Sequence, residues 1–305
     1  MYGTGSSPLP LPSMLDALLE QRPFKDQIFV SAGTEQHKWG RDETREHVSA
    51  TARGLLEYGF KNGEQLLTWT GPTEVEALMA VLGAAHSGAH VVGLDGDVDA
   101  TAVNAALGQR GARGLLVGRA RAAGNKDRAS ELVAPGPGVA ASSQEPGLEG
   151  AACPALRMHE RFSSTGVVKA SQLPSLRYVF DASHPRDVNG FLGFFQMPVY
   201  HATPCPLPRV APFVDAGGPL YTAGYADGAG IRWGDAVTQI EAMALAARGA
   251  KSMGLTSEDV VLVTAPTHGS ATMLGVCLGA LQAGAKLLFP GRGFDAFQAC
   301  SAITR

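Results

Sequence analysis

Along the first 118 residues, short apolar runs alternate with stretches in which apolar residues recur at helical spacing. Short aliphatic runs predict β-strands at residues 27–32, 65–70, 89–94 and 114–118. Apolar residues at helical spacing predict α-helices at residues 41–58, 74–87 and 102–110. Strands that alternate with helices of this length indicate parallel βαβ units, with helices on both faces of the sheet.

The same alternation returns after residue 173. Strands are expected within residues 173–180, 255–263 and 285–289, and helices at 236–253, 271–283 and from 294 onward. The helix at 236–253 is predicted to pack through one apolar face, formed by Val237, Ile240, Met243, Ala244 and Ala247. A short amphipathic helix at 13–20 is predicted near the N-terminus.

Residues 119–172 break this pattern, because they are rich in Gly, Pro, Ala and Ser. The chain is therefore divided into a first α/β subdomain (1–118), a low-complexity insertion or linker (119–172) and a second α/β subdomain (173–305). A segment with the composition of 119–172 buries little apolar surface by itself. Another protein chain is the simplest way to hold it in one conformation.

Composition and charge narrow the classes of protein. The 305 residues are 45% hydrophobic and 17% charged, which is typical of a globular chain with a sizeable core. The net charge of -3 gives no electrostatic reason to expect nucleic acid, and no apolar run reaches transmembrane length. Residues 1–12 do not resemble a signal peptide. The cysteines show no paired spacing and are expected to be free thiols: Cys153, Cys205, Cys277 and Cys300.

The candidate chemistry centres on a glycine-rich stretch, Leu220–Ile231, between an apolar run and the helix expected at 236–253. A small-residue loop between a strand and a helix can bind phosphate through its backbone N–H groups. Such a loop normally adds a lysine and several hydroxyls. This stretch contains no lysine, one early hydroxyl (Thr222) and an acid, Asp227.

The stretch resembles the phosphate-binding signature of the adenylate-forming superfamily, which includes acyl-CoA synthetases, luciferases and peptide-synthetase adenylation domains. That signature runs Tyr-Thr-Ser-Gly-Thr-Thr-Gly-Lys-Pro-Lys-Gly-Val. The positions that match it are Tyr221, Thr222, Gly224, Gly230 and Ile231. Ala223 replaces the serine, Tyr225 and Ala226 replace the two hydroxyls, and both lysines are absent.

Other segments carry the same resemblance. Lys61–Glu64 resembles the family's Lys-Lys-Gly-Asp turn, Ala77–Gly93 its following helix and strand, and Leu173–Val179 its Leu-Pro-Ser-Leu-Arg-x-Val entry to a strand. Pro266–Gly269 resembles its Pro-Leu-Phe-His loop, with His268 at the histidine. The resemblance implies an α/β fold of parallel-sheet layers with helices on both faces, like part of the large N-terminal domain of acyl-CoA synthetases.

Three residues are the vestigial site candidates: Thr222, Gly224 and His268. The resemblance implies that His268 lines an acyl or nucleotide pocket, and the alternative is a packing role, since no acidic partner is evident in the sequence nearby. Thr222 and Gly224 either contact a phosphate or keep the backbone path of a turn. Asp95, Asp97 and Asp99 lack the downstream glutamate of a calcium loop and indicate a polar turn. No catalytic residue, cofactor or metal is assigned.

The resemblance also implies that the acids which hold magnesium and ribose, and the C-terminal lysine, lie beyond the position that matches Arg305. We therefore expect a catalytically inactive relative of acyl-CoA synthetases, acting with other protein subunits as a structural or accessory component. A mitochondrial membrane complex is the expected setting, with the cytoplasm as the other compartment. The alternatives are an adenylate-forming acid ligase completed by another chain, and a non-catalytic nucleotide or acyl-CoA binder.

Overall fold

The computed structural model describes the helices, strands and turns of most of the chain. The described residues are 11, 28–32, 37–118, 121–122, 126–127, 173–182, 192–194, 218–227, 230–291 and 296–303. The helix predicted at 13–20 and most of the insertion predicted at 119–172 lie outside these residues.

Apart from β2, which the sequence analysis does not include, the elements of the first part begin and end within two residues of their predicted bounds. The strands are β1 (Ile28–Ala32), β2 (His37–Gly40), β3 (Gln65–Trp69), β4 (His90–Leu94) and β5 (Gly114–Val117). The helices are α2 (Arg41–Glu57), α3 (Val75–Ser87) and α4 (Ala100–Arg110). Helix α3 ends at Gly88, which adopts φ +79° and donates its N–H to the carbonyl of Ala84. A residue with a side chain rarely adopts that conformation, so the glycine fixes the end of the helix.

Shorter strands are more frequent after residue 118. A two-stranded hairpin, β6 (Arg121–Ala122) and β7 (Lys126–Asp127), is followed by β8 (Tyr178–Asp181), β9 (Leu192–Gly193), β10 (Pro219–Ala226), β11 (Ile231–Trp233) and β12 (Val237–Thr238). The remaining strands are β13 (Val260–Leu262) and β14 (Lys286–Phe289). The helical elements are α7 (Gln239–Met253), the π-helix η3 (Ala271–Cys277), α8 (Leu278–Ala283) and α9 (Ala296–Ile303).

Two main sheets organise the molecule. The larger has the order β11-β10-β4-β3-β5-β8-β9, and its strands from β10 to β9 are parallel. The smaller has the order β13-β14-β1-β2, in which β13, β14 and β1 are parallel. The predicted α/β class with parallel-sheet layers is confirmed.

Both sheets combine strands from distant parts of the chain. In the larger sheet β10 pairs with β4, aligning Tyr221 with Val91, and in the smaller sheet β14 pairs with β1. The boundaries predicted at residues 118 and 173 therefore do not coincide with the division between the sheets. Periodicity reports the elements of a chain but not which strands become neighbours.

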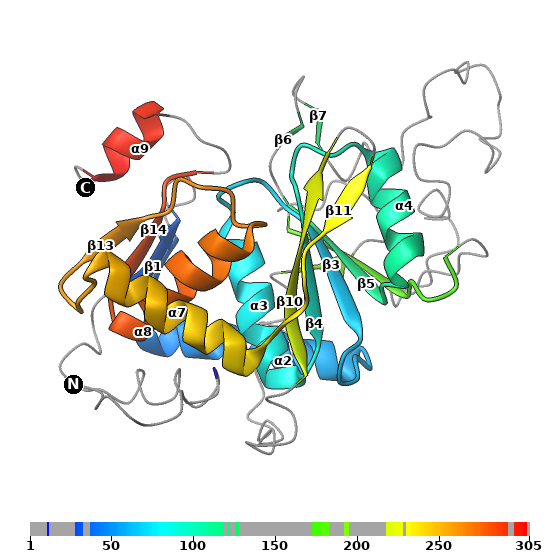
Figure 1. The fold of residues 1–305 in the computed structure, drawn as a ribbon, viewed down its shortest axis with the longest axis horizontal. Helices are drawn as coiled ribbons and strands as arrows, with labels where there is room; N and C mark the ends of the chain where they lie inside the picture. The colour runs from blue at the N-terminus through cyan, green and yellow to red at the C-terminus, as the bar shows by residue number, and fades with distance from the viewer. Residues whose placement is uncertain are drawn as a thin grey trace.

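The buried side chains form two layers of core on either side of the larger sheet. Leu66 and Val91 belong to the cluster that contains α2 and α3, whereas Leu67 and Val92 belong to the cluster that contains α4. Successive residues of a strand point to opposite faces, so the near-continuous apolar strands feed both layers. Helices α2 and α3 lie between the two sheets, and α4 covers the opposite face of the larger one (Figure 1).

The predicted packing face of α7 is confirmed at Met243 and wrong at Ala244 and Ala247, which are exposed. Ile240 is 48% exposed, while the helix buries Gln239, Ala242, Met243 and Ala246. A Cβ on Gly279 would lie 2.9 Å from the Ala246 carbonyl oxygen, so α7 and α8 approach backbone to backbone. Two helices that pack this closely need small residues such as Ala and Gly at the contact. These residues are weakly hydrophobic, so a search for hydrophobic periodicity does not detect them. Among the described residues, no helix has the length and apolarity needed to cross a membrane.

Candidate site at the ends of the parallel strands

The glycine-rich stretch folds as a strand and a hairpin, which corrects the prediction of a loop leading into a helix. Strand β10 runs to Ala226, and β11 returns antiparallel, with Tyr225 opposite Arg232. The N–H of Asp227 donates to the carbonyl of Gly230 at 3.1 Å and closes the turn. Asp227 also lies 3.8 Å from the guanidinium of Arg232. The carboxylate of Asp227 and one backbone N–H of the turn therefore have partners within the hairpin itself.

The backbone of the motif is held in the sheet on both sides. On one side Tyr221 to Gly224 pair in parallel with Val91 to Leu94 of β4. On the other side β10 pairs with β11 and β12. When a strand has a neighbouring strand on each side, its backbone N–H groups donate hydrogen bonds to the carbonyl groups of those strands. This part of β10 therefore presents no row of free N–H groups to a phosphate.

Gly224 makes room for an aromatic side chain. A Cβ at this position would lie 2.6 Å from the ring of Trp233 and 3.1 Å from a methyl carbon of Leu94. The Trp233 ring is in turn covered by the guanidinium of Arg110, 5.0 Å from the ring centroid. The space left by the glycine is thus filled from within the protein.

The Thr222 hydroxyl is buried and faces a histidine. Thr222 is 1% exposed, and its Oγ1 lies 3.0 Å from Nε2 of His90, which is 3% exposed. Burial, and then the positive charge of Arg110, lower the pKa of His90 to about 4. His90 is therefore neutral at pH 7, and the hydroxyl takes part in an interior contact.

His268 lies at the carboxyl ends of β4 and β10, next to an acid. Its Nε2 is 3.8 Å from Oδ2 of Asp95, the residue directly after β4. No acidic partner was evident near His268 in the sequence, and the fold supplies one from a distant segment. The Tyr225 ring meets the imidazole edge-on, with 5.8 Å between ring centroids. Asp95 and Tyr225 come together because neighbouring parallel strands end at the same edge of a sheet, and the loop that follows β13 brings His268 to that edge.

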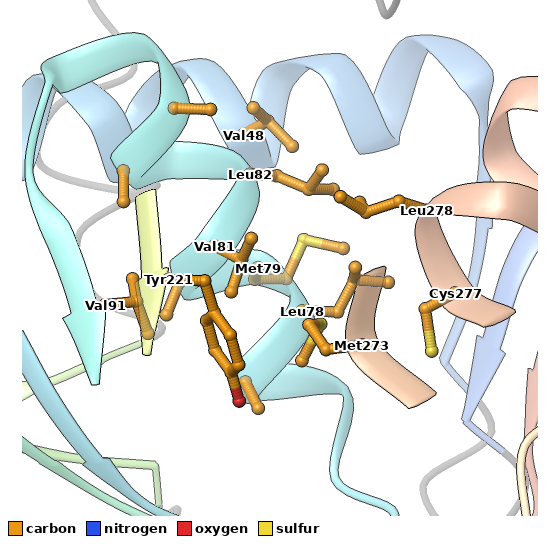
Figure 2. Close-up of a cluster of buried hydrophobic side chains, with 14 of the residues drawn as sticks. Val48, Leu78, Met79, Val81, Leu82, Val91, Tyr221, Met273, Cys277 and Leu278 are labelled. Atoms are coloured by element: carbon orange, nitrogen blue, oxygen red, sulfur yellow. The ribbon is translucent and has the colours of Figure 1, made fainter. Parts of the chain in front are cut away.

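Tyr221 fixes the loop that carries His268. Its hydroxyl donates to the carbonyls of His268 at 2.8 Å and Thr267 at 3.2 Å. The ring points into the core from β10, beside Val81 and Val91 (Figure 2). A Cβ on Gly93 would collide with the Tyr221 hydroxyl, so that glycine is required for the contact. Sequence reasoning noted Tyr221 as a motif match and missed this role.

His268, Asp95 and Tyr225 form a cluster whose electrostatics favour a neutral imidazole. Burial lowers the pKa of His268, and the nearby carboxylates of Asp95 and Asp97 only partly oppose that effect. Tyr225 is 39% exposed, so the cluster of His268, Asp95 and Tyr225 is open to solvent on one side. A neutral imidazole beside a carboxylate and an aromatic ring can accept a hydrogen bond and stack on a planar group. The carboxylates of Asp95 and Asp97 would repel a phosphate, and so would Asp227, which lies two residues after Tyr225 in the sequence.

The calcium-loop residues act as the predicted polar turn. The N–H of Asp97 donates to Asp95 Oδ1 at 3.0 Å, and Asp99 accepts from the N–H of Ala102 at 2.7 Å as the N-cap of α4. Within the part of the chain that the structure describes, no group of three His, Cys, Asp or Glu side chains could hold a metal ion. Cys277 is buried, which raises the pKa of its thiol to about 12, and Cys300 is exposed. Cys153 and Cys205 lie outside the described residues.

Comparison with known proteins defines the class of fold. Family models and curated proteins give no match to this sequence. Solved structures do: the apo structure of Mycobacterium smegmatis MbtA matches with a TM-score of 0.65 and 21% identity over 93% of this chain. A putative long-chain-fatty-acid CoA ligase from Rhodopseudomonas palustris matches with a TM-score of 0.68 and 15% identity over 97% of the chain. The fold is that of the N-terminal domain of acyl-CoA ligases.

A third match bears on the extent of that domain. The anthranilate CoA ligase AuaEII, solved in complex with anthranoyl-AMP, matches with a TM-score of 0.68 and 13% identity over 98% of this chain. The matched region covers 44% of MbtA, 61% of the fatty-acid ligase and 48% of AuaEII. The chain thus spans about half the length of these structural relatives.

Proposed function

We propose that this chain is a catalytically inactive relative of acyl-CoA ligases that serves as a structural or accessory subunit of a larger assembly. The observation that carries the proposal is the state of the phosphate motif. Its backbone is paired on both edges of β10, its threonine faces the buried His90, and its turn contains an acid in place of lysines. A mitochondrial membrane is the proposed setting of this assembly.

Nucleotide binding by the purified chain tests this proposal. We expect no heat of binding when ATP and Mg²⁺ are titrated at millimolar concentration, and no AMP when a panel of carboxylic acids is added. The same assays on the assembly isolated from source cells should also give no acid-dependent AMP. Acid-dependent AMP formation by either preparation contradicts the proposed inactivity. Fractionation of the source cells tests the compartment separately.

A ligase completed by another chain is the second candidate. Two observations favour it: AuaEII was solved with anthranoyl-AMP and MatB from Rhodopseudomonas palustris with ATP, and this chain spans about half of each. In this case the assembly forms AMP from ATP and an acid, and the variant His268→Ala lowers that rate. The purified chain alone remains inactive.

Non-catalytic ligand binding is the third candidate, favoured by the solvent-open cluster of His268, Asp95 and Tyr225. A ligand that binds only the native state raises its stability by RT ln(1 + [L]/Kd). Thermal unfolding with AMP, ATP or CoA therefore separates this role from a purely structural one. A shift that disappears in Tyr225→Ala, with the variant still folded, supports binding at the cluster.

A further inference from the structure

Helix α7 carries an apolar stripe that is exposed to solvent. Ile240, Ala244 and Ala247 are all exposed, Ile240 at 48%, and Lys251 continues the line. These positions are spaced by four, three and four residues, so they lie along one face of the helix. The buried face, which contains Ala246, is a different one and packs against α8 and η3. Figure 1 shows α7 on the near side of the molecule.

A groove borders the C-terminal end of this stripe. It has a volume of about 440 Å³, and its lining residues come from the ends of α7 and α8: Ala247, Ala250, Lys251, Gly254, Leu255, Gln282 and Ala283. The first four follow the spacing i, i+3, i+4 and i+7. Four residues with this spacing form the hole that receives a side chain in knobs-into-holes packing. Gly254 leaves one corner of the hole open, because nothing lies within 4 Å of a Cβ built there.

The exposed isoleucine and the groove suit an antiparallel partner of the same sequence. When Ala244 lies opposite Ala247 of a second copy, Ile240 lies opposite Lys251 of that copy and above the groove. A two-fold contact uses the same patch of surface twice, so each copy supplies one Ile240 and one groove. The alanines at the centre are small and allow a close approach of the two helices.

The charges beside the stripe favour the same orientation. Glu241 and Arg248 are exposed, and each directly follows a residue of the stripe, so they share one flank of it. Antiparallel pairing places Glu241 of one copy near Arg248 and Lys251 of the other, and the symmetry repeats this contact. The two bonds from Thr238 to Glu241 use Oε2, and a guanidinium can bond at Oε1. Parallel pairing would instead set Lys251 against Lys251, and like charges at a contact are unfavourable.

The size of the contact indicates its strength. Helix α7 has 15 residues and is therefore about 22 Å long. Stable interfaces bury about 1,200–2,000 Å² of surface. A single pair of helices of this length lies at the low end of that range, so we expect reversible association.

We propose that two copies of this chain associate through antiparallel α7 helices, with Ile240 of each copy seated in the groove beside Lys251 of the other. The occupant of the stripe is thus a second copy of the chain. This inference goes beyond the proposed function, because a scaffold subunit and a ligase can both self-associate. Failure of one proposal therefore leaves the other intact.

A charge placed at the isoleucine tests the contact. Ile240→Lys sets an ammonium group against Lys251 of the second copy, while Met253→Lys adds the same charge elsewhere on α7, at a residue that is 43% exposed and outside the stripe. Sedimentation equilibrium of the purified wild type should show a monomer and a dimer in proportions that depend on concentration. We expect Ile240→Lys to weaken association about tenfold or more, about 1.4 kcal/mol, and Met253→Lys to associate like the wild type. Thermal unfolding of each monomer should match the wild type.

Two results of that experiment overturn the proposal. One is a wild type that remains monomeric up to millimolar concentration. The other is a folded Ile240→Lys variant that associates as well as Met253→Lys.

Zero-length crosslinking tests the orientation without a mutation. A carbodiimide joins a carboxylate to an amine only where the two groups touch. Glu241 and Lys251 lie ten positions apart on one helix, about 15 Å along its axis, so an amide between them forms only between copies. In a mixture of isotope-labelled and unlabelled chain, we expect crosslinked peptides that join position 241 of one isotope to position 251 of the other. Crosslinks between copies that join only other segments, or a dimer without this amide, overturn the antiparallel contact.

Discussion

The hydroxyl of Tyr221 donates to the carbonyl of His268 at 2.8 Å and so ties the strand of the degenerate phosphate motif to the loop that carries the site imidazole. The same loop is held from a third direction, because the N–H of Thr267 donates to the carbonyl of Pro72 at 2.7 Å. Tyr221 is 1% exposed, and burial raises the pKa of its phenol, which keeps the hydroxyl protonated as a donor. Tyr221 of the motif therefore stabilises the position of the loop that carries His268.

Removal of that hydroxyl should destabilise the fold. Tyr221→Phe leaves the carbonyls of Thr267 and His268 without this donor, and a buried acceptor left unpaired costs about 1–3 kcal/mol. We expect a lower urea midpoint with an unchanged m-value. Tyr225→Phe is the matched control, because Tyr225 is 39% exposed, and its midpoint should stay close to that of the wild type. Equal effects of the two variants would show that the Tyr221 bonds contribute nothing.

Gly93 and Tyr221 should be energetically coupled. In Gly93→Ala the new Cβ would collide with the Tyr221 hydroxyl and approach the Cα of His268 to 3.3 Å. Overpacking of this kind costs about 1–3 kcal/mol. The double variant Gly93→Ala/Tyr221→Phe removes the closest atom, so its destabilisation should be smaller than the sum of the two single effects. Strict additivity in urea unfolding would contradict the contact.

The Thr222 hydroxyl should matter for stability rather than for nucleotide affinity. Thr222→Val keeps the shape but removes the oxygen that lies 3.0 Å from His90 Nε2, at an expected cost of about 1–3 kcal/mol. Thr222→Ser keeps the oxygen and should lose less. Stability is read from urea unfolding, and nucleotide affinity from titration calorimetry. A variant of normal stability with altered ATP binding would instead support a phosphate-binding role.

Acid should destabilise the protein through His90. Its pKa falls from 6.5 in the unfolded chain to about 4 in the folded state, so the unfolded state binds more protons between these values. The stabilisation from neutral His90 is fully present above pH 6.5 and is lost as the pH falls towards 4, where the loss reaches about 3 kcal/mol. Urea unfolding at several pH values should show this slope in the wild type.

His90→Gln is the control for that slope, since it removes the titrating group. His268 also has a lowered pKa, so both proteins are compared in a His268→Gln background. The difference in unfolding free energy between them should change between pH 6.5 and 4 and be constant above pH 7. A pH-independent difference would show that His90 titrates equally in the folded and unfolded states.

Most elements were predictable because their signals are local. The alternation of apolar runs and helical spacing located β3, α3 and β4 within one or two residues, and Gly88 marked the end of α3. The face of α7 was predicted only in part, because the contact with α8 uses Ala and Gly, whose small size matters only against a neighbouring backbone.

The candidate site was only partly predictable. His268 was found through its loop, yet its partner Asp95 lies more than 170 positions earlier in the sequence and was assigned only to a turn. A rule that inspects residues directly after each parallel strand would have selected Asp95. The hairpin at Asp227 was missed because its signal is the pairing between β10 and β11, which no periodicity contains.

The sequence by itself determined most of the elements, the α/β class and the loss of lysines from the phosphate motif, because each of these depends on neighbouring residues. The tertiary structure decided what the remaining motif residues do. Parallel pairing of β10 with β4 placed Thr222 against His90, and the packing of Trp233 occupied the space above Gly224. Sheet order also left β13 with a single neighbour among the described strands. These outcomes depend on contacts between distant segments, and only the folded chain brings those segments together.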